Sequence, residues 1–89
     1  MKAFITVVGK DRVGIIAAVS GLLSQLNINI EDISQTIMQG MFTMVMAVEL
    51  GQATLAFEDV AAKLLAEGEK LGIEISIRHK DIFEAMHRI

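Results

Sequence analysis

The 89-residue chain contains no cysteine, no tryptophan and no tyrosine. Without cysteine it can form no disulfide, no thiolate nucleophile and no cysteine-ligated metal site. Its four phenylalanines are spread along the chain, so the sequence offers no aromatic platform on which nucleic-acid bases could stack. The eight lysines and arginines are scattered and the net charge is −3, whereas phosphate binding requires clustered positive charge. We therefore expect no nucleic-acid partner.

Long apolar runs are also missing from the sequence. No run reaches the roughly 18 residues that a membrane-spanning helix requires. The N-terminus enters a strand-like pattern directly and lacks the form of a signal peptide. We therefore expect a cytoplasmic protein with no membrane partner, and the length predicts a single domain over residues 1–89.

Apolar residues are abundant for so short a chain. Hydrophobic residues make up 53% of the sequence, and the mean hydropathy is +0.52. A domain of this size has a high ratio of surface to volume, so one small core cannot enclose all of this apolar surface. Burial against a second copy would solve the problem, and we therefore expect a homodimer. Within one chain, Met41, Met44 and Met46 are expected to fill the core.

Six segments show the periodicity of regular secondary structure. Residues 2–8, 28–38, 41–50 and 73–80 are predicted as strands, and residues 14–26 and 56–71 as helices. The first and third strands are apolar on both alternating sets of positions, which is typical of central strands. In the second strand the alternation changes phase at Glu31-Asp32, which predicts a β-bulge or a bend at a sheet edge. The fourth strand alternates apolar and polar residues, as an edge strand should.

The order of these segments, βαββαβ, predicts the fold class. It is an α+β, ferredoxin-like sandwich with an antiparallel sheet in the order 4-1-3-2 and two helices on one face. This topology places the first and third strands in the middle, where their apolar pattern independently places them. Residues 81–89 predict a short C-terminal helix, capped by Asp81, that seals a core or a dimer edge. The apolar stripe of this helix comprises Ile82, Phe83, Met86 and Ile89.

The most informative stretch joins the first strand to the first helix and reads Gly9-Lys10-Asp11-Arg12-Val13-Gly14. Glycine at both ends permits a sharp turn and a close approach of the backbone to another molecule. The helix that follows presents unpaired N–H groups and the positive end of its dipole. This junction therefore predicts a site for a small anion such as a carboxylate.

The side chains around this junction allow two interpretations. In a binding site, Arg12 would bind a carboxylate through its planar fork and Asp11 would accept a ligand ammonium group. In a purely structural role, Asp11 caps the helix and Arg12 is solvated. Turn geometry alone accounts for Gly9 and Gly14, with ligand approach as an added use. Asn29 either binds a ligand or satisfies backbone groups where the second strand starts.

Together these features resemble the ACT domain family of small-molecule-binding regulatory modules. The resemblance covers almost the whole chain and rests on the order of the elements, on the pattern Gly9-x-Asp11-Arg12-x-Gly14 and on Asn29-Ile30. Residues 7–11, 32–36 and 82–86 look closest to a group of short, stand-alone ACT proteins (UPF0237-like).

The resemblance implies a ligand held between two domains. Backbone amides of Asp11, Arg12, Val13 and Gly14 would contact it, and Asn29 would supply a side-chain amide. One departure matters, because several amino-acid-binding members have an amide side chain where this chain has Asp11. A carboxylate at that position would repel a ligand carboxylate but could hold a ligand ammonium group.

Catalytic and metal sites are not expected. His79 continues an apolar strand pattern and should be packed or lie at an edge, and neither it nor His87 has carboxylates at metal-ligand spacing. No cofactor is expected. Glu31 and Asp32 occupy adjacent strand positions that point to opposite faces, which does not suit an acid pair. No cysteine is available, and neither histidine is tied to a plausible serine, so we expect no enzyme.

The sequence therefore predicts a non-enzymatic regulatory or sensor protein. It would dimerise through the edge of the second strand and the first helix, and bind an amino acid or a similar small carboxylate at the interface. Its output would pass through an effector protein, since 89 residues leave no space for an effector domain. The alternative is an interaction module that binds no metabolite.

Overall fold

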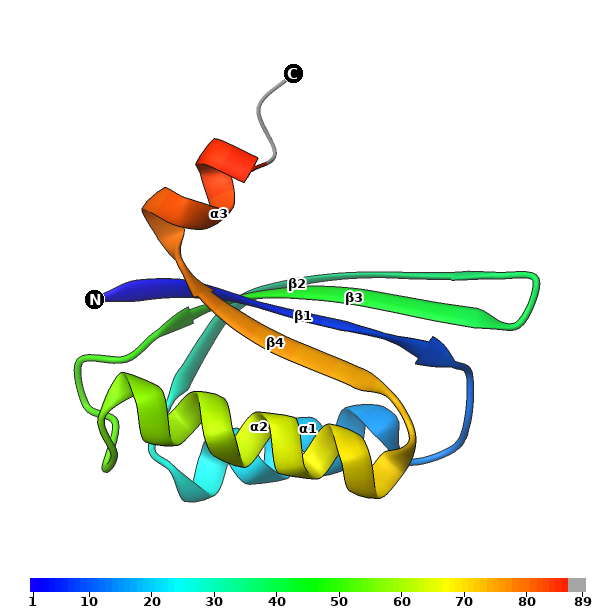
Figure 1. The fold of residues 1–89 in the computed structure, drawn as a ribbon, viewed down its shortest axis with the longest axis horizontal. Helices are drawn as coiled ribbons and strands as arrows, with labels where there is room; N and C mark the ends of the chain where they lie inside the picture. Colours follow the sequence, from blue (N-terminus) through cyan, green and yellow to red (C-terminus); the bar gives the residue numbers. More distant parts are fainter. Residues whose placement is uncertain (87–89) are drawn as a thin grey trace.

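The computed structural model describes residues 1–86 and contains the predicted βαββαβ order (Figure 1). The strands are β1 (Lys2–Lys10), β2 (Asn29–Met38), β3 (Met41–Glu49) and β4 (Glu74–His79). The helices are α1 (Ile15–Gln25), α2 (Phe57–Leu71) and a short α3 (Lys80–Met86). The bounds predicted for the first six elements agree with these to within about two residues, which is the usual uncertainty of helix and strand ends.

The four strands form one antiparallel sheet in the order β2-β3-β1-β4, which confirms the predicted order 4-1-3-2. β1 and β3 are its central strands. Ile5 of β1 lies opposite Met46 of β3 on one side and opposite Ile77 of β4 on the other. Because directly opposed residues share a face, these three buried side chains form one row of the core.

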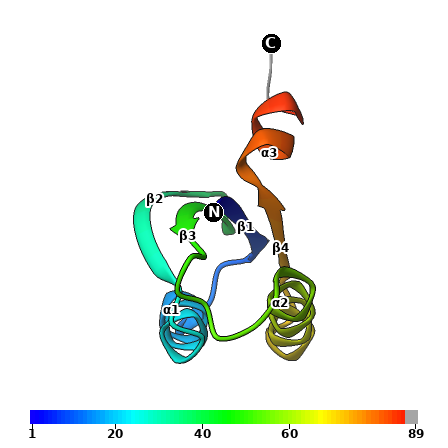
Figure 2. The ribbon, with the colours of Figure 1, turned by 90° about the vertical axis from the view of Figure 1, so that its left-hand side faces the viewer.

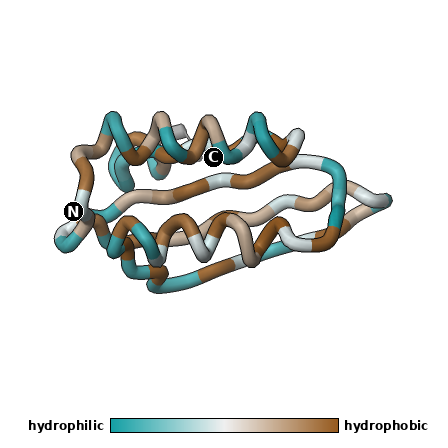
Figure 3. The backbone as a smooth tube through the Cα atoms, turned by 90° about the horizontal axis from the view of Figure 1, so that it is seen from below, coloured by the Kyte–Doolittle hydropathy of each residue, from teal (hydrophilic) through white to brown (hydrophobic). Residues whose placement is uncertain are grey.

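Both long helices cover the same face of the sheet. α1 lies beneath the β2 side and α2 beneath the β4 side (Figure 2). Seen from the helix side, the residues of α1 are mainly apolar, whereas α2 alternates polar and apolar residues (Figure 3). Each helix buries residues four apart, which lie on one side of a helix. They are Ile15, Val19 and Leu23 of α1 and Val60, Leu64 and Gly68 of α2.

The opposite face of the sheet is largely open, and we call it the open face. In β1, Ala3, Ile5 and Val7 are buried beneath the helices, whereas Phe4 and Thr6 on the open face are half-buried and Val8 is exposed. The apolar pattern on both sides of β1 therefore identified a central strand but not a second covering layer. Met41 also lies on the open face and is 50% exposed, so its prediction as a core residue is wrong, whereas Met44 and Met46 are buried as predicted.

The predicted irregularity of β2 is a β-bulge at Glu31. Ile30 lies opposite Val48, and the next residue of β2 to find a partner is Asp32, opposite Ala47. Glu31 is the extra residue, and it accounts for the change of phase in the sequence. As a result Ile30 and Ile33 lie on the helix-covered side of the sheet, while Asn29 and Asp32 lie on the open face.

α3 rises from the end of β4 on the side of the open face (Figures 1 and 2). The ring of Phe83 stacks on that of Phe4 with 4.4 Å between centroids, so α3 covers one end of the open face. The helix begins at Lys80, which places Asp81 inside its first turn rather than at the predicted cap position. His79 is packed, as predicted, with its ring 4.0 Å from that of Phe57. His87 and Ile89 lie outside the described residues.

Candidate functional site

The loop between β1 and α1 begins as a continuation of the sheet. The backbone N–H of Asp11 donates to the carbonyl oxygen of Gly40 at 2.8 Å, so the loop starts beside the turn that joins β2 to β3. The Asp11 side chain is exposed. The N-cap of α1 is Gly14, and in the described chain no side chain makes a capping hydrogen bond there. The structural interpretation of Asp11 as a helix cap is therefore wrong.

The backbone conformation at position 14 requires glycine. Its φ angle is +94°, in the left-handed region that side chains other than glycine rarely adopt, although a Cβ there would meet no atom within 4 Å. The first turn of α1 carries no acidic residue. Its N–H groups have no carbonyl partner within the helix and, together with the helix dipole, favour a negative charge at this point.

Gly9 is required for close packing instead. A Cβ on Gly9 would lie 2.4 Å from Cγ2 and 2.8 Å from Cβ of Ile73, the residue that precedes β4. Gly68 of α2 shows a similar constraint, because its Cβ would lie 2.7 Å from the backbone oxygen of Ile73. The two glycines therefore allow β1 and α2 to close around Ile73, and packing accounts for Gly9 without a ligand.

Arg12 ties the loop to the end of α2. Its Nη1 donates to the carbonyl oxygen of Leu71 at 2.5 Å, although the side chain is exposed. The alternative of a merely solvated arginine is therefore wrong. A guanidinium group has five N–H donors, so one bond leaves most of the fork available to a carboxylate. Beside it, the apolar side chain of Val13 is fully exposed.

Asn29 lies at the other end of the sheet from this loop. It stands opposite Glu49 at the start of β2, whereas the loop follows Lys10, the last residue of β1. Nine residues of β1 span about 27 Å at about 3.4 Å per residue. One chain therefore brings together Gly9, Asp11, Arg12, Val13 and Gly14 but not Asn29. The predicted strand order already implied this separation, because the first and second strands both pair antiparallel to the third and so start at the same end of the sheet.

An ion-pair network that the sequence did not reveal surrounds the start of β2. The N-terminal ammonium contacts Glu49 Oε2 at 2.6 Å, and Lys2 Nζ contacts both carboxylate oxygens of Glu31 at 2.6 Å and Glu49 Oε1 at 3.5 Å. The N-terminal ammonium and the N–H of Gly51, which donates at 2.8 Å, lower the pKa of Glu49 to about 2. Hydrogen bonding to Glu31 raises the pKa of Lys2.

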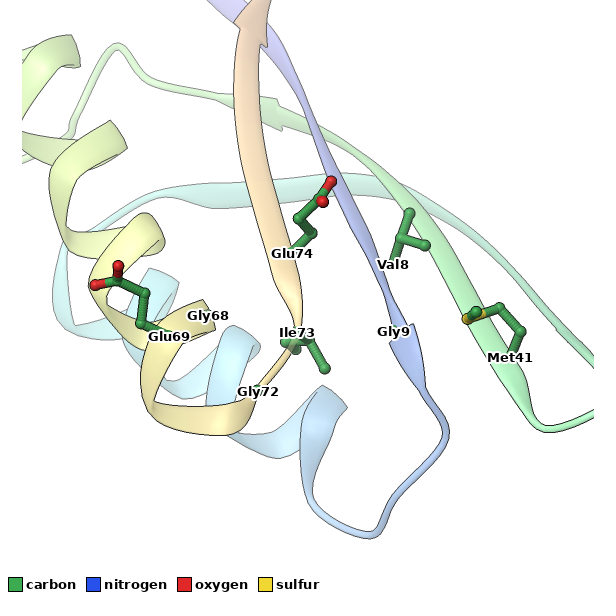
Figure 4. A pocket seen from close by; sticks show the side chains of 8 residues that line it. All are labelled: Val8, Gly9, Met41, Gly68, Glu69, Gly72, Ile73 and Glu74. Carbon is green, nitrogen blue, oxygen red and sulfur yellow. The ribbon is translucent and has the colours of Figure 1, made fainter.

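A hollow of about 390 Å³ lies between β1, β4 and the end of α2 (Figure 4). Val8, Met41 and Glu74 line it from the sheet and Glu69 from α2, and Gly9 is the one residue it shares with the predicted site. In the described part of the chain its lining contains two carboxylates and no cation. The C-terminal end of a helix adds negative potential. The lining itself therefore does not suit a ligand carboxylate, although Nη1 of Arg12 lies beside it, 3.8 Å from where a Cβ on Gly72 would be.

Comparison with known proteins places the chain in a family. The family model of the ACT domain matches residues 2–78. The chain belongs to the ACT domain family. A UPF0237 protein of Listeria monocytogenes is 52% identical over 89 residues, which cover 100% of both chains. The structure of an ACT domain protein from Streptococcus pneumoniae superposes with a TM-score of 0.82 at 45% identity and covers 98% of both chains.

A more distant structure that is similar to this chain is longer than it. The regulatory subunit of aspartate kinase from Thermus thermophilus is similar to this chain with a TM-score of 0.58 and 25% identity, over 86% of this chain and 50% of that one. The Listeria and Streptococcus relatives, by contrast, match this chain over almost their full length. They confirm the resemblance to stand-alone ACT proteins that was inferred from the loop, the second strand and the tail.

The two adjacent carboxylates of this ACT domain that were considered as an acid pair bind different partners. Glu31 binds Lys2, and Asp32 Oδ1 accepts the N–H of Ile33 at 2.9 Å, so the two carboxylates do not act on a common point. Within residues 1–86 no cluster of three or more His, Cys, Asp or Glu residues could hold a metal ion. Over the same residues no helix is long and apolar enough to cross a membrane.

The lowered pKa of Glu49 predicts the effect of modifying the N-terminus. Because the pKa is lowered, the ionised group stabilises the fold above its ordinary pKa of 4.5, and this contribution is lost as the pH falls through about 2. Acetylation of the N-terminal amine removes the largest cause, so the pKa of Glu49 should rise toward 4.5. Side-chain carboxyl shifts in an NMR pH titration measure this. Lys2→Met removes a smaller cause and should raise the pKa less; equal rises would contradict the assignment.

Proposed function

We propose that this ACT domain is a cytoplasmic, non-enzymatic regulatory module that works as a homodimer. Two copies would join along β2 and α1, bind a small carboxylate such as an amino acid at the seam, and pass the bound state to an effector protein. The observation that carries the proposal is the position of the exposed apolar side chains. Among the described residues, five of the ten exposed large apolar side chains lie on β2, on α1 beneath it or in the β1–α1 loop: Val13, Ile16, Ile33, Ile37 and Met38.

This arrangement supports an interface along one edge of the sheet. β2 is an edge strand, and an unpaired edge presents rows of N–H and C=O groups that a second strand can satisfy. Ile33 and Ile37 lie on the helix-covered side of that edge and are 42% and 54% exposed. A second copy placed edge to edge would cover these side chains together with the outer side of α1.

The β1–α1 loop supports binding of a carboxylate near this edge. The first turn of α1 offers N–H groups, and the free donors of Arg12 add a positive charge. The exposed carboxylate of Asp11 would accept an ammonium group. An α-amino acid carries both groups on one carbon atom. The ligand-binding residues we propose are therefore Gly9, Asp11, Arg12, Val13 and Gly14 of one subunit and Asn29 of the partner subunit.

Arg12 also offers a route by which binding could alter the rest of the domain. Its bond to Leu71 O joins the loop to the end of α2, and β4 and α3 follow directly along the chain. A carboxylate that competes for the guanidinium would change this link. The name of the aspartate kinase regulatory subunit agrees with a regulatory use of the fold.

Thermal unfolding in the presence of free amino acids and related small carboxylates tests the proposal. A ligand present at about 100 times its dissociation constant should stabilise the dimer by roughly 2.7 kcal/mol. Arg12→Gln and Asn29→Ala should abolish the shift while leaving the fold intact, whereas Lys10→Gln, which removes a cation outside the proposed contacts, should retain it. The absence of a shift with every compound would contradict ligand binding.

The alternative is an interaction module that binds no metabolite. It is favoured by the separation of Asn29 from the loop within one chain and by the hydrogen bond that already engages Arg12. Under this alternative Arg12→Gln and Asn29→Ala would leave association with a partner protein unchanged.

A further inference from the structure

The β-bulge of β2 limits how two copies can meet along that edge. In an antiparallel pair, directly opposed residues point to the same face of the sheet. When two identical strands pair about a two-fold axis, this condition holds only if the axis lies midway between the two copies of one residue, which then oppose each other. An axis level with the bond between two residues would pair residues that point to opposite faces. The bulge reverses the alternation of faces along β2. Residues on both sides of the bulge can therefore pair with one partner strand only if Glu31 itself is left unpaired.

From these constraints we infer that the two-fold axis of the proposed dimer passes through Ser34. This inference rests on the proposed edge-to-edge dimer and specifies its register. Ser34 would lie opposite Ser34 of the partner subunit. On either side of it, with Glu31 omitted, the opposed pairs would be Ile33 with Gln35, Asp32 with Thr36, Ile30 with Ile37, and Asn29 with Met38.

Every one of these pairs has both members on one face. Gln35 and Ile37 lie opposite Met44 and Phe42 of β3, whose side chains face the helices. Ile30 and Ile33 lie opposite Val48 and Met46, which also face the helices. Asn29, Asp32, Ser34, Thr36 and Met38 all lie on the open face. The bulge therefore allows every residue of β2 except Glu31 to pair without a clash of faces.

Axes centred on neighbouring residues leave parts of β2 without a strand partner or create an unfavourable pair. An axis at Gln35 would place Ile30 opposite Gln39 in the turn, where φ is +52°, and would leave Asn29 unpaired. An axis at Ile33 would leave Ile37, which is 54% exposed, beyond the end of the partner's strand. An axis at Asp32 would oppose two identical carboxylates, which destabilises a strand pair. The axis at Ser34 avoids all three.

The register brings a residue of the second copy to the end of the sheet where the β1–α1 loop begins. Asn29 of the partner subunit would lie beside Met38, at the end of the sheet where Asp11 bonds to Gly40. Lys2 then acts as a positioning residue, because its bidentate contact with Glu31 holds the bulge that places Asn29 on the open face. The backbone N–H of Ile33, which donates to Asp32 Oδ1 in the single chain, would donate to the partner strand instead.

Engineered cysteines test the register directly, because the natural chain has none. At the axis the two Cα atoms would be about 4.5–5.5 Å apart, within the range of a disulfide. Under mild oxidation the full-length Ser34→Cys variant should therefore double its mass from 9.7 kDa on a non-reducing gel. Ile33→Cys and Gln35→Cys are matched controls, since two copies of either would be about 8 Å apart, too far for a disulfide. Asp32→Cys and Thr36→Cys should cross-link only when mixed with each other.

The outcomes separate the register from the proposed function. Cross-linking of Ile33→Cys or Gln35→Cys in preference to Ser34→Cys would overturn the register and leave the edge-to-edge dimer standing. A dimer in light scattering that cross-links at none of these positions, and whose spin labels at position 34 are far apart, would overturn both the register and the β2 seam. Circular dichroism of each variant verifies folding, and a spin label at Ser34 measures the same separation in any variant that resists oxidation.

Discussion

Gly9→Ala should destabilise the fold by about 2–3 kcal/mol, the upper part of the range for overpacking a core. The new Cβ would lie 2.4 Å from Cγ2, 2.8 Å from Cβ and 3.2 Å from the backbone Cα of Ile73. A rotation of the Ile73 side chain could relieve the first contact but not the other two. Relief would require β1 and the start of β4 to separate, although Val8 and Glu74 are directly paired there. Chemical denaturation monitored by circular dichroism measures the effect.

Gly21→Ala is the matched control for this prediction. Gly21 lies within α1, and a Cβ there would meet no atom within 4 Å. Alanine in a helix interior is favoured over glycine by about 0.5–1 kcal/mol, so this variant should be more stable than the natural chain. If both variants changed stability in the same direction, the contact with Ile73 would not be the reason for glycine at position 9.

The order of the sheet could be predicted because local patterns report which faces of a strand are covered. The apolar positions of β1 and β3 and the phase change at Glu31 are all read over a few residues, and each was confirmed by the pairing of the strands. The same patterns could not show what covers the open face. An apolar residue such as Val8 or Met41 has the same pattern whether it meets a second layer of its own chain, another copy or solvent.

Contacts between distant parts of the chain account for most of what the sequence could not reveal. Arg12 and Leu71 are 59 residues apart, and neither residue type signals the bond that joins them. Gly9 was expected to serve the turn, but its constraint comes from Ile73. The network at the start of β2 depends on Lys2 reaching the bulged Glu31 across β3. Residue types and spacing limit such contacts, but only the register of the strands determines them.

Ile37→Lys should dissociate the proposed dimer. Ile37 lies on the edge strand with its side chain on the helix-covered side and is 54% exposed in one chain. Complete burial of an isoleucine contributes about 1.5–3 kcal/mol, so the exposed half contributes about 1 kcal/mol. A two-fold interface contains the residue twice, and an unpaired ammonium group would add a desolvation cost at each copy. Together these terms should raise the dissociation constant about 100-fold or more, since each 1.4 kcal/mol is a factor of ten.

Leu65→Lys is the control for the change in composition. Leu65 lies on α2, on the β4 side of the domain, and is 59% exposed, so the variant loses a similar apolar area and gains the same charge away from β2. Sedimentation equilibrium over a range of concentrations should show weakened association for Ile37→Lys and an unchanged constant for Leu65→Lys. If Leu65→Lys dissociated the protein and Ile37→Lys did not, the interface would lie on α2. The β1–α1 loop would then have no second subunit beside it, and the proposed ligand site would lose Asn29.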